Sequence, residues 1–402
     1  MNVFIIPSWY PGTRNPMAGS FIAEQAKAMA ELPNVNIAVS LWGQASLEIN
    51  PRRVRSFLSF LKWCGQRKSF SERFEGLYEA YNPAVYWSHR LPLGGVKRLR
   101  GANLDNFNAV KDKLGGVDLI HAHVGYPAGC LAEHISERTG VPYVLTEHMG
   151  PFPFPSLLRR GRLIPELLSA YANASRVIAV SPAQAAMMKL YGISNPLVIP
   201  NFVDEREFDC ALPQGEKFGF LTVCSVTVAK GVGDLLRAIA LWRPSAGKVE
   251  FRIIGDGPDF HYFRSESERL GISDLVNWYG AVPRNQIATF FKGCHAFVMP
   301  SHCESFGMVY AEAIACGKPV IATKCGGPEF IVNGGNGVLV EVADVDSLCR
   351  ALQDIHNNWT HFSASDIRRD FMKRFSRFAV SRSLMQVYEE VSHADTSLKR
   401  EP

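Results

Sequence analysis

The sequence has no long hydrophobic run, no paired cysteine motif and no low-complexity tract. No stretch approaches the roughly 18 consecutive apolar residues that a membrane-spanning helix needs. The first residues, MNVFIIPSWYPG, carry no basic segment and only a short apolar run before Pro7, so they predict a first β-strand rather than a signal peptide. We therefore expect a cytoplasmic protein whose only contact with a membrane is peripheral, at its inner face.

The nine cysteines are an odd number, are scattered along the chain, and form no C-x-x-C pair with the spacing of zinc ligands. This pattern argues against a disulfide framework and against a zinc ribbon. We expect reduced thiols that act as small core residues.

Length and composition favour two globular domains. The chain has 402 residues, of which 47% are hydrophobic and 20% charged, and a typical domain takes about 150 residues. The net charge of +5 is unevenly spread, because residues 1–200 carry an excess of basic side chains and residues 201–402 a slight acidic excess. The basic half should face an anionic partner.

Short β-branched runs alternate with longer amphipathic stretches in both halves, which predicts βαβ units and parallel sheets. The expected strands of the first half are NVFIIP, VNIAVSL, DLIHAHV, PYVLTEH and RVIAVS. Those of the second half are GFLTVCSV, VEFRIIG, LVNWYG, CHAFVMP, PVIAT and GVLVE. The boundary between the two domains is expected near 198–208. This gives an N-terminal domain over 1–200 and a C-terminal domain over 205–375. A helix and tail over 376–402 are expected to return to the N-terminal domain. Ligands are expected beyond the carboxyl ends of the strands, where two such domains would enclose a site between them.

The strongest motif lies at 298–327, VMPSHCESFGMVYAEAIACGKPVIATKCGG, where seven residues separate Glu304 from Glu312. The order is a strand, a loop and a helix that opens near Gly307. The first turn of a helix exposes N–H groups and partial positive charge, which suits a diphosphate. Glu304 is then placed to bind a sugar hydroxyl, and Glu312 a ribose diol. The residues expected to line the diphosphate are Phe306, Gly307, Met308 and Val309.

This segment resembles the E-x7-E motif of glycosyltransferase family 4, together with the E-A-x-A-x-G-x-P-V-[IV]-A-T run that follows it. The resemblance implies a GT-B fold, in which two Rossmann-like α/β domains face each other across a cleft. It implies that the N-terminal domain over 1–200 binds the acceptor and that the C-terminal domain over 205–375 binds the nucleotide sugar. It also implies retaining sugar transfer from a nucleotide sugar, with Glu304 among the catalytic residues and no metal ion or other cofactor.

Further segments of the second half resemble the same family. VTVAKGVGDLLRAIALW matches its K-G-x-x-x-L-[IL]-x-A pattern, which implies that Lys230 neutralises the leaving diphosphate. Ser225 stands where many members carry a second phosphate-binding arginine, so phosphate binding would depend more on Lys230 and on backbone amides. Gly257 and Val282 lie in segments whose backbone meets the nucleotide in the family, although glycine at such a strand end is also a common turn former.

In the first half, the resemblance implies that Gly19 contacts phosphate and that His123, at the end of a strand, faces the donor sugar and the acceptor. Alternation places His121 on the same face as His123. No carboxylate or cysteine lies at metal spacing beside these histidines, so a metal site is not expected. A buried core histidine remains the alternative for both. The weaker acceptor candidates are Glu147, His148 and Asn201.

One D-x-D triplet, Asp344-Val345-Asp346, has the form of a metal motif from a different glycosyltransferase fold. It precedes a helical segment, so Asp344 is expected to be an N-cap and Asp346 a first-turn acid.

Residues 51–70 combine six basic side chains, no acid and interleaved aromatic and leucine residues. This composition suits an anionic membrane surface and suggests a lipid-linked acceptor. A basic surface helix with an apolar face is the alternative, and no nucleic-acid motif accompanies the charge.

Together these patterns predict a hexosyltransferase-type enzyme that moves a sugar from a nucleotide sugar, with a UDP-sugar favoured, to a glycan during polysaccharide or glycolipid synthesis. The rivals are a phosphorylase or epimerase of the same fold and a non-catalytic nucleotide- or glycan-binding protein. A nicotinamide dehydrogenase is disfavoured because no G-x-G-x-x-G follows the first strand.

Overall fold

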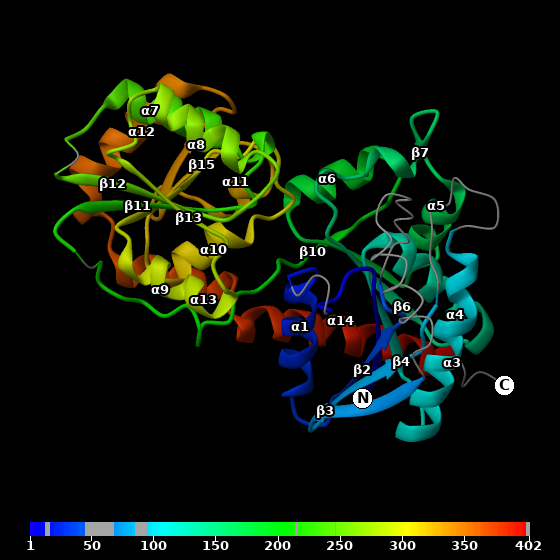
Figure 1. Cartoon of the computed structure of the whole chain (residues 1–402). Helices are drawn as coiled ribbons and strands as arrows, with labels where there is room; N and C mark the ends of the chain where they lie inside the picture. The colour runs from blue at the N-terminus through cyan, green and yellow to red at the C-terminus, as the bar shows by residue number, and fades with distance from the viewer. Residues whose placement is uncertain (13–16, 45–67, 85–94, 214, 246, 399–402) are drawn as a thin grey trace. The chain divides into compact units, whose positions relative to one another are not determined.

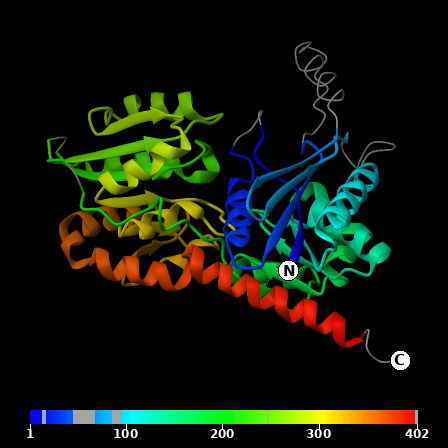
Figure 2. The same cartoon turned by 90° about the horizontal axis from the view of Figure 1, so that it is seen from below.

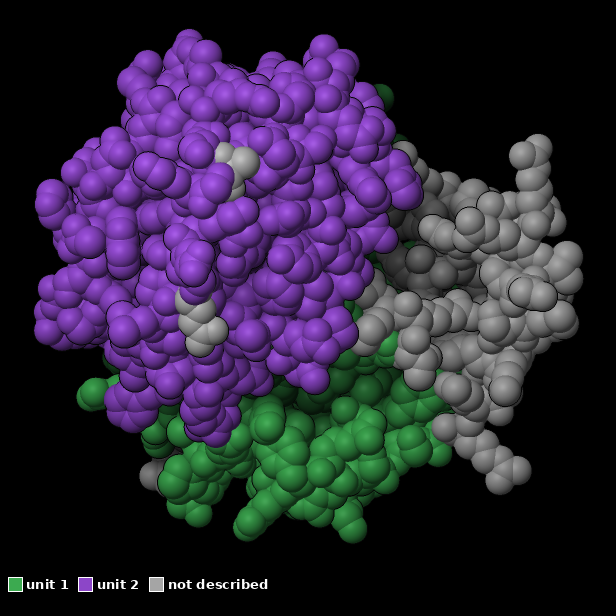
Figure 3. All heavy atoms as spheres, turned by 60° about the vertical axis from the view of Figure 1, so that its left-hand side comes forward, with its two compact units in different colours: residues 1–180, 185–199, 381–402 green, residues 181–184, 200–380 purple. Residues whose placement is uncertain are grey.

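The computed structural model describes residues 1–12, 17–44, 68–84, 95–213, 215–245 and 247–398. The chain forms two compact units, which Figure 3 distinguishes by colour. Unit 1 comprises residues 1–180, 185–199 and 381–402, and unit 2 comprises residues 181–184 and 200–380. The segment 51–67, which holds most of the basic and aromatic stretch, lies outside the described residues.

Unit 1 is built on a sheet whose order, in the described part of the chain, is β10-β9-β6-β5-β1-β2-β4-β3. All neighbours are parallel except β3 and β4, which form an antiparallel hairpin at one edge. The strands are β1 (Asn2–Pro7), β2 (Asn36–Leu41), β3 (Ser69–Phe74), β4 (Leu77–Tyr81), β5 (Leu119–His123), β6 (Tyr143–Glu147), β9 (Arg176–Ala179) and β10 (Leu197–Val198). A separate two-stranded hairpin is formed by β7 (Leu158–Arg159) and β8 (Arg162–Leu163).

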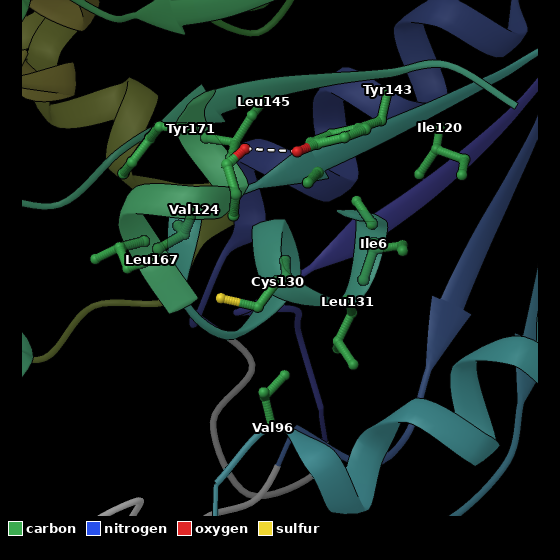
Figure 4. Close-up of a cluster of buried hydrophobic side chains, with 14 of the residues drawn as sticks. Ile6, Val96, Ile120, Val124, Cys130, Leu131, Tyr143, Leu145, Leu167 and Tyr171 are labelled. Carbon is green, nitrogen blue, oxygen red and sulfur yellow. Dashed lines mark hydrogen bonds between the residues drawn. The ribbon is translucent and has the colours of Figure 1, made fainter. Parts of the chain in front are cut away.

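The helices of unit 1 bury apolar faces on this sheet. They are α1 (Ser20–Ala30), α3 (Lys97–Leu114), α4 (Cys130–Thr139), α5 (Pro165–Ala172), most of α6 (Pro182–Leu190) and the part of α14 (Arg377–Leu398) from Ser381 onward. Figure 4 shows part of the core, in which Ile6 of β1 lies between Ile120 of β5 and Leu131 of α4. In Figure 2, α14 is the long red helix, seen along its whole length. Burial of these apolar side chains is the main term that holds the unit together.

Unit 2 has a parallel sheet with the order β13-β12-β11-β14-β15-β16 in its described residues. Its strands are β11 (Phe218–Val223), β12 (Val249–Ile254), β13 (Val276–Gly280), β14 (Ala296–Met299), β15 (Val320–Thr323) and β16 (Gly337–Val340). Figure 1 shows α7 (Val232–Trp242), α8 (Phe260–Arg269) and α12 (Val345–Asn358) on one face and α9 (Arg284–Gly293), α10 (Met308–Ala315) and α13 (Ala364–Arg374) on the other. The short α11 (Pro328–Ile331) follows β15.

Each sheet has a point where the strand order reverses, and open α/β sheets bind ligands beyond the strand ends at such points. In unit 1 the chain runs from β1 to β2 and β4, then crosses back to β5, so the reversal lies between β1 and β5. In unit 2 it lies between β11 and β14. The residues that follow these four strands therefore define where a site is expected.

Every strand predicted from the sequence is present, and the last predicted helix is α14. The β3–β4 hairpin was not predicted. The SFSERF run of β3 is mostly exposed and lacks the β-branched residues that marked the buried strands. Asp344 caps α12 by accepting a hydrogen bond from the Ser347 N–H at 2.9 Å, which confirms its predicted role.

Candidate active site

A lysine follows β11 at the reversal point of unit 2. After β11 the chain makes a single 3-10 turn that ends at Lys230, and Gly231 then starts α7 with a φ of 69°. A Cβ on Gly231 would lie 1.8 Å from the carbonyl oxygen of Pro300, so only glycine allows the loop after β14 to approach so closely. The Lys230 turn and the loop after β14 are thereby packed against each other.

The loop after β14 presents Glu304 to this lysine. The ammonium of Lys230 lies 2.6 Å from Oε1 of Glu304, and the hydroxyl of Ser301 donates to the same oxygen at 2.9 Å. No side chain or backbone group of the described residues donates to Oε2 of Glu304, so that oxygen is left to accept from a ligand. Backbone pairing with Gly326 and Gly327 fixes the loop itself.

A second connection joins the same two loops. The backbone N–H of His302 donates to the carbonyl of Ala229 at 2.9 Å, and His302 Nε2 lies 2.7 Å from Asp234 on α7. Arg237 also pairs with Asp234. His302 and Asp234 were not predicted as site residues, because their contact links positions 68 residues apart in the sequence. These hydrogen bonds fix the positions of Lys230 and Glu304 relative to each other.

Helix α10 begins where the sequence predicted, directly after Gly307. This residue has a φ of 93°, and a Cβ there would lie 2.4 Å from the ring of Tyr310, so glycine suits both the conformation and the packing. No side chain of the described residues caps the helix. The amides of Met308 and Val309, both half-buried, are therefore open to an anion, while Phe306 is buried beneath the turn.

Glu312 lies inside α10 and pairs with Arg284, a residue that was not predicted from the sequence. The side chain of Glu312 is 2% exposed, and Oε1 accepts from Arg284, at the start of α9, at 2.5 Å. Arg284 follows β13, so the pair joins the helix after β14 to the segment after β13. Arg284 stands within the PRNQ segment, where nothing in the sequence distinguishes it from an exposed helix residue.

The remaining donor candidates follow the neighbouring strands of unit 2. Ser225 is exposed two residues after β11, and Val282 is half-buried between β13 and α9. Gly257 follows β12, and a Cβ there would lie 2.4 Å from the carbonyl of Val226. All three are at the same edge of the sheet as Lys230, since the strands are parallel.

The reversal point of unit 1 carries three histidines. His123 ends β5, and its Nδ1 lies 3.1 Å from Nε2 of His148, which follows β6. His121 shares the face predicted from alternation, with its ring centroid 4.1 Å from that of His123. Nδ1 of His121 contacts the hydroxyl of Tyr388 at 2.6 Å and its Nε2 contacts Thr146 at 2.8 Å. His121 is thus fully engaged in the core.

Burial keeps these histidines neutral. It lowers the pKa of His121 to about 3, with His148 as the second cause, and it lowers the pKa of His148 to about 3. The pKa of His123 is also well below its usual value, first because of burial and then because of the two neighbouring imidazoles. Nε2 of His123 is buried and has no hydrogen-bond partner among the described residues. This nitrogen therefore has hydrogen-bonding capacity that the described part of the chain does not use.

Val124, directly after His123, has a strained backbone. Its φ of 75° is rare for a β-branched residue, and it is held by a bond from its N–H to the carbonyl of Thr146 at 2.8 Å. Such strain is concentrated at functional sites.

Gly19, the predicted phosphate contact of unit 1, precedes α1. It has a φ of 66°, and the ring of Phe21 in α1 lies 4.8 Å from the ring of His148.

Glu147 has a different role from the one expected. Instead of reaching an acceptor, its buried carboxylate accepts from the N–H groups of Gly125, His148 and Met149 and from the hydroxyl of Tyr171. Burial raises its pKa, and these four donors oppose that shift. Glu147 therefore positions the loops around His123 and His148. Asn201, the other weak acceptor candidate, is buried and belongs to unit 2.

Two family models together match residues 18–374 of the chain. The model of "Glycosyltransferase Family 4" matches residues 18–207, and that of "Glycosyl transferases group 1" matches residues 204–374. A D-inositol 3-phosphate glycosyltransferase of Frankia alni is 30% identical over 280 residues, which are 60% of this chain and 67% of that protein. The chain belongs to glycosyltransferase family 4. This family 4 protein is therefore a glycosyltransferase.

Other relatives agree with this assignment. An uncharacterized glycosyltransferase of Methanocaldococcus jannaschii is 28% identical over 326 residues, which are 78% of this chain and 89% of that protein. The structure of Anabaena HepE in complex with UDP has a TM-score of 0.70 and 20% identity, and covers 97% of this chain and 99% of HepE. HepE has also been solved with UDP-glucose. The family 4 enzyme therefore has the predicted GT-B fold of two domains with parallel sheets.

Membrane-spanning helices and metal-ligand clusters are both absent from the described residues. In that part of the chain no helix has the length and apolar character to span a membrane. No three His, Cys, Asp or Glu side chains of that same part of the chain gather as metal ligands would.

Proposed function

We propose that this family 4 enzyme transfers a sugar from a nucleoside diphosphate sugar, with UDP-sugars as the favoured donors, to a hydroxyl of a glycan, with retention of the anomeric configuration and without a metal ion. The observation that carries the proposal is the Lys230–Glu304 pair at 2.6 Å beside the uncapped start of α10. The UDP and UDP-glucose complexes of HepE support the donor class.

Lys230 and α10 are the groups that stabilise the departing diphosphate in this proposal. An ammonium has three N–H donors, so Lys230 can keep its bond to Glu304 while it donates to a phosphate oxygen. The amides of Met308 and Val309 supply further donors where negative charge develops as the bond from the sugar C1 to phosphate breaks. The chain's own donors thus take the place of a metal ion.

The proposed reaction is a front-face substitution. The acceptor hydroxyl oxygen bonds to C1 on the side that the diphosphate leaves, and its proton passes to the departing phosphate oxygen. Glu304 holds the sugar through Oε2, Glu312 holds the ribose, and the neutral imidazole of His123 binds a hydroxyl through Nε2. No side chain is assigned as a covalent nucleophile.

The acceptor is proposed to be lipid-linked, with the protein at the cytoplasmic face of a membrane. The support is the composition of residues 51–70, with six basic side chains and interleaved aromatics. Co-sedimentation with anionic vesicles tests this part. Replacement of Arg52, Arg53 and Arg55 by glutamine should release the protein from the vesicles, and unchanged binding would exclude the segment as the membrane contact.

The reaction itself is tested with a panel of UDP-, GDP- and ADP-sugars, each mixed with a glycan whose free hydroxyls serve as the acceptor, in the presence of EDTA. We expect release of UDP from one UDP-sugar, and a product whose proton NMR coupling shows the donor's anomeric configuration. Alanine at both Lys230 and Glu312 should abolish the release. Full turnover by that double variant, or an inverted product, would contradict the proposal, and phosphate-dependent breakdown of a glycan would favour the phosphorylase rival.

A further inference from the structure

Unit 1 holds a pocket that none of the predicted site residues line. Its volume is about 340 Å³, at the lower end of the roughly 300–1,000 Å³ that small-molecule sites occupy. Three of its lining side chains are cationic, namely those of Lys97, Arg100 and Arg159, and one is acidic, that of Glu166. We call it the α3–α5 pocket, because the first residues of these two helices form part of its wall.

The segments that line the pocket all follow carboxyl ends of parallel strands of unit 1. Tyr126 comes directly after β5, and Ser156 lies in the connection after β6. Helix α3 belongs to the crossover that begins at β4, which is parallel to β2. The pocket therefore lies at the edge of the sheet where open α/β domains bind ligands.

The three cations of the pocket have no partner for their side chains among the described residues. Within the described residues, Lys97, Arg100 and Arg159 have neither an ion pair nor a side-chain hydrogen bond, whereas arginines such as Arg252 and Arg269 pair with carboxylates. Nε of Arg100 is buried without a hydrogen-bond partner in that part of the chain. A buried guanidinium N–H left unbonded costs free energy, which an anionic ligand would recover.

The other wall of the pocket is apolar. Val96 belongs to the core of unit 1, and Figure 4 shows it beside Cys130 and Leu131 of α4. Leu158 and Ile164 pack against the same core. Cations on one side and an apolar wall on the other suit a ligand that carries a phosphate on a carbon skeleton, rather than a bare ion.

We propose that the α3–α5 pocket binds a phosphate ester of the acceptor, with Arg100 and Arg159 as its principal ligands. This inference rests on the proposed function and on the expectation that the N-terminal domain binds the acceptor. A phosphate ester fits better than a carboxylate because it offers three oxygens and up to two charges to three separate cations. The phosphate belongs either to a soluble sugar phosphate or to a lipid headgroup.

Titration of the full-length protein with glycerol 1-phosphate tests the site, with glycerol as the uncharged control. We expect saturable binding of the phosphate ester only. Arg159→Gln and Arg100→Gln should each weaken it about tenfold or more, as loss of a charge-assisted hydrogen bond implies. Glu166→Gln should strengthen it, because a negative charge leaves the wall. Lys111→Gln, on the exposed surface of α3 outside the pocket, should bind like the wild type.

A competition experiment distinguishes the two possible sources of the phosphate, a lipid headgroup and a soluble sugar phosphate. If it is a lipid headgroup, vesicles that contain phosphatidic acid, whose headgroup is a phosphate monoester, displace glycerol 1-phosphate and phosphatidylcholine vesicles do not. If it is a soluble sugar phosphate, neither kind of vesicle does. Thermal unfolding of each variant shows whether it is folded, and Arg159 is exposed enough that its loss should leave the fold intact. Equal affinity in wild type, Arg159→Gln and Arg100→Gln, or no binding at all, would overturn the proposal.

Titration of the same samples with UDP distinguishes failure of the α3–α5 pocket proposal from failure of the proposed function. Binding of UDP without binding of glycerol 1-phosphate rejects the α3–α5 pocket and leaves the proposed function intact. Binding of glycerol 1-phosphate without any nucleotide rejects the proposed donor site instead.

Discussion

The hydroxyl of Tyr388 lies 2.6 Å from Nδ1 of His121, although 267 residues separate the two in the sequence. Both side chains are fully buried in unit 1, and His121 packs against His123, whose Nε2 has no hydrogen-bond partner among the described residues. The last helix of the chain therefore supports the histidine cluster from beneath. Tyr388 is a positioning residue, since it acts on His123 only through His121.

Replacement of Tyr388 by phenylalanine should lower both stability and turnover. It leaves Nδ1 of His121 buried and unbonded, at a cost of about 1–3 kcal/mol in the free energy of unfolding. A tilted His121 should shift His123 and reduce kcat severalfold, with the KM for the donor unchanged. Steady-state kinetics and guanidinium unfolding measure these effects.

Tyr143→Phe is the matched control for that experiment. Tyr143 is also buried in unit 1, and its hydroxyl donates to the carbonyl of Ala170 at 2.7 Å, away from the histidines. This variant should lose comparable stability and keep its kcat. An equal loss of kcat in the two variants would show that Tyr388 has only a structural role.

Stability should depend on pH through the buried histidines. Their folded pKa values lie far below the unfolded value of about 6.5, so the unfolded chain takes up protons that the folded chain refuses. The free energy of unfolding should therefore fall as the pH drops from about 6.5 toward 3, by up to about 1.4 kcal/mol per pH unit for each histidine.

The comparison of wild type with His123→Gln isolates this effect, because Glu147, whose pKa is raised, contributes with the opposite sign above about pH 4.5. Denaturant unfolding at pH 8 and pH 5.5 should show a smaller difference for the variant. An equal difference in both proteins would mean that His123 is protonated in the folded state.

The Glu312–Arg284 pair allows the structural and ligand roles of Glu312 to be separated. Glu312→Ala leaves the guanidinium of Arg284 without this carboxylate, which should lower the free energy of unfolding of unit 2 by about 3 kcal/mol. Methionine at both positions should recover much of that loss. If Glu312 binds ribose, the affinity for UDP stays low in the double variant, as calorimetric titration would show. Recovery of UDP binding together with stability would rule out ribose contact.

The sequence predicted the parts of the site that depend on local order. Lys230 and Glu304 lie in loops that follow strands with visible β-branched runs, and Glu312 lies in the helix that follows Gly307. Their placement therefore followed from the alternation of strands and helices. The shared face of His121 and His123 followed from the period of a strand.

The parts that were missed depend on contacts between distant segments. Arg284, Asp234 and Tyr388 are ordinary helix residues in the sequence, and only folding brings them to Glu312, His302 and His121. The sequence placed Glu147 at the end of a strand but did not indicate that it positions the neighbouring loops. No local pattern shows that four donors converge on its carboxylate.

The central claim is that Lys230 and the start of α10 bind the diphosphate of the donor. Calorimetric titration with UDP, GDP and ADP tests it most directly, on wild type, Lys230→Ala and Lys248→Ala, the last an exposed lysine at the amino end of β12. We predict binding of UDP by the wild type and by Lys248→Ala, and at least about tenfold weaker binding by Lys230→Ala. Binding of none of the three nucleotides, or equal affinity in Lys230→Ala and wild type, would contradict the account.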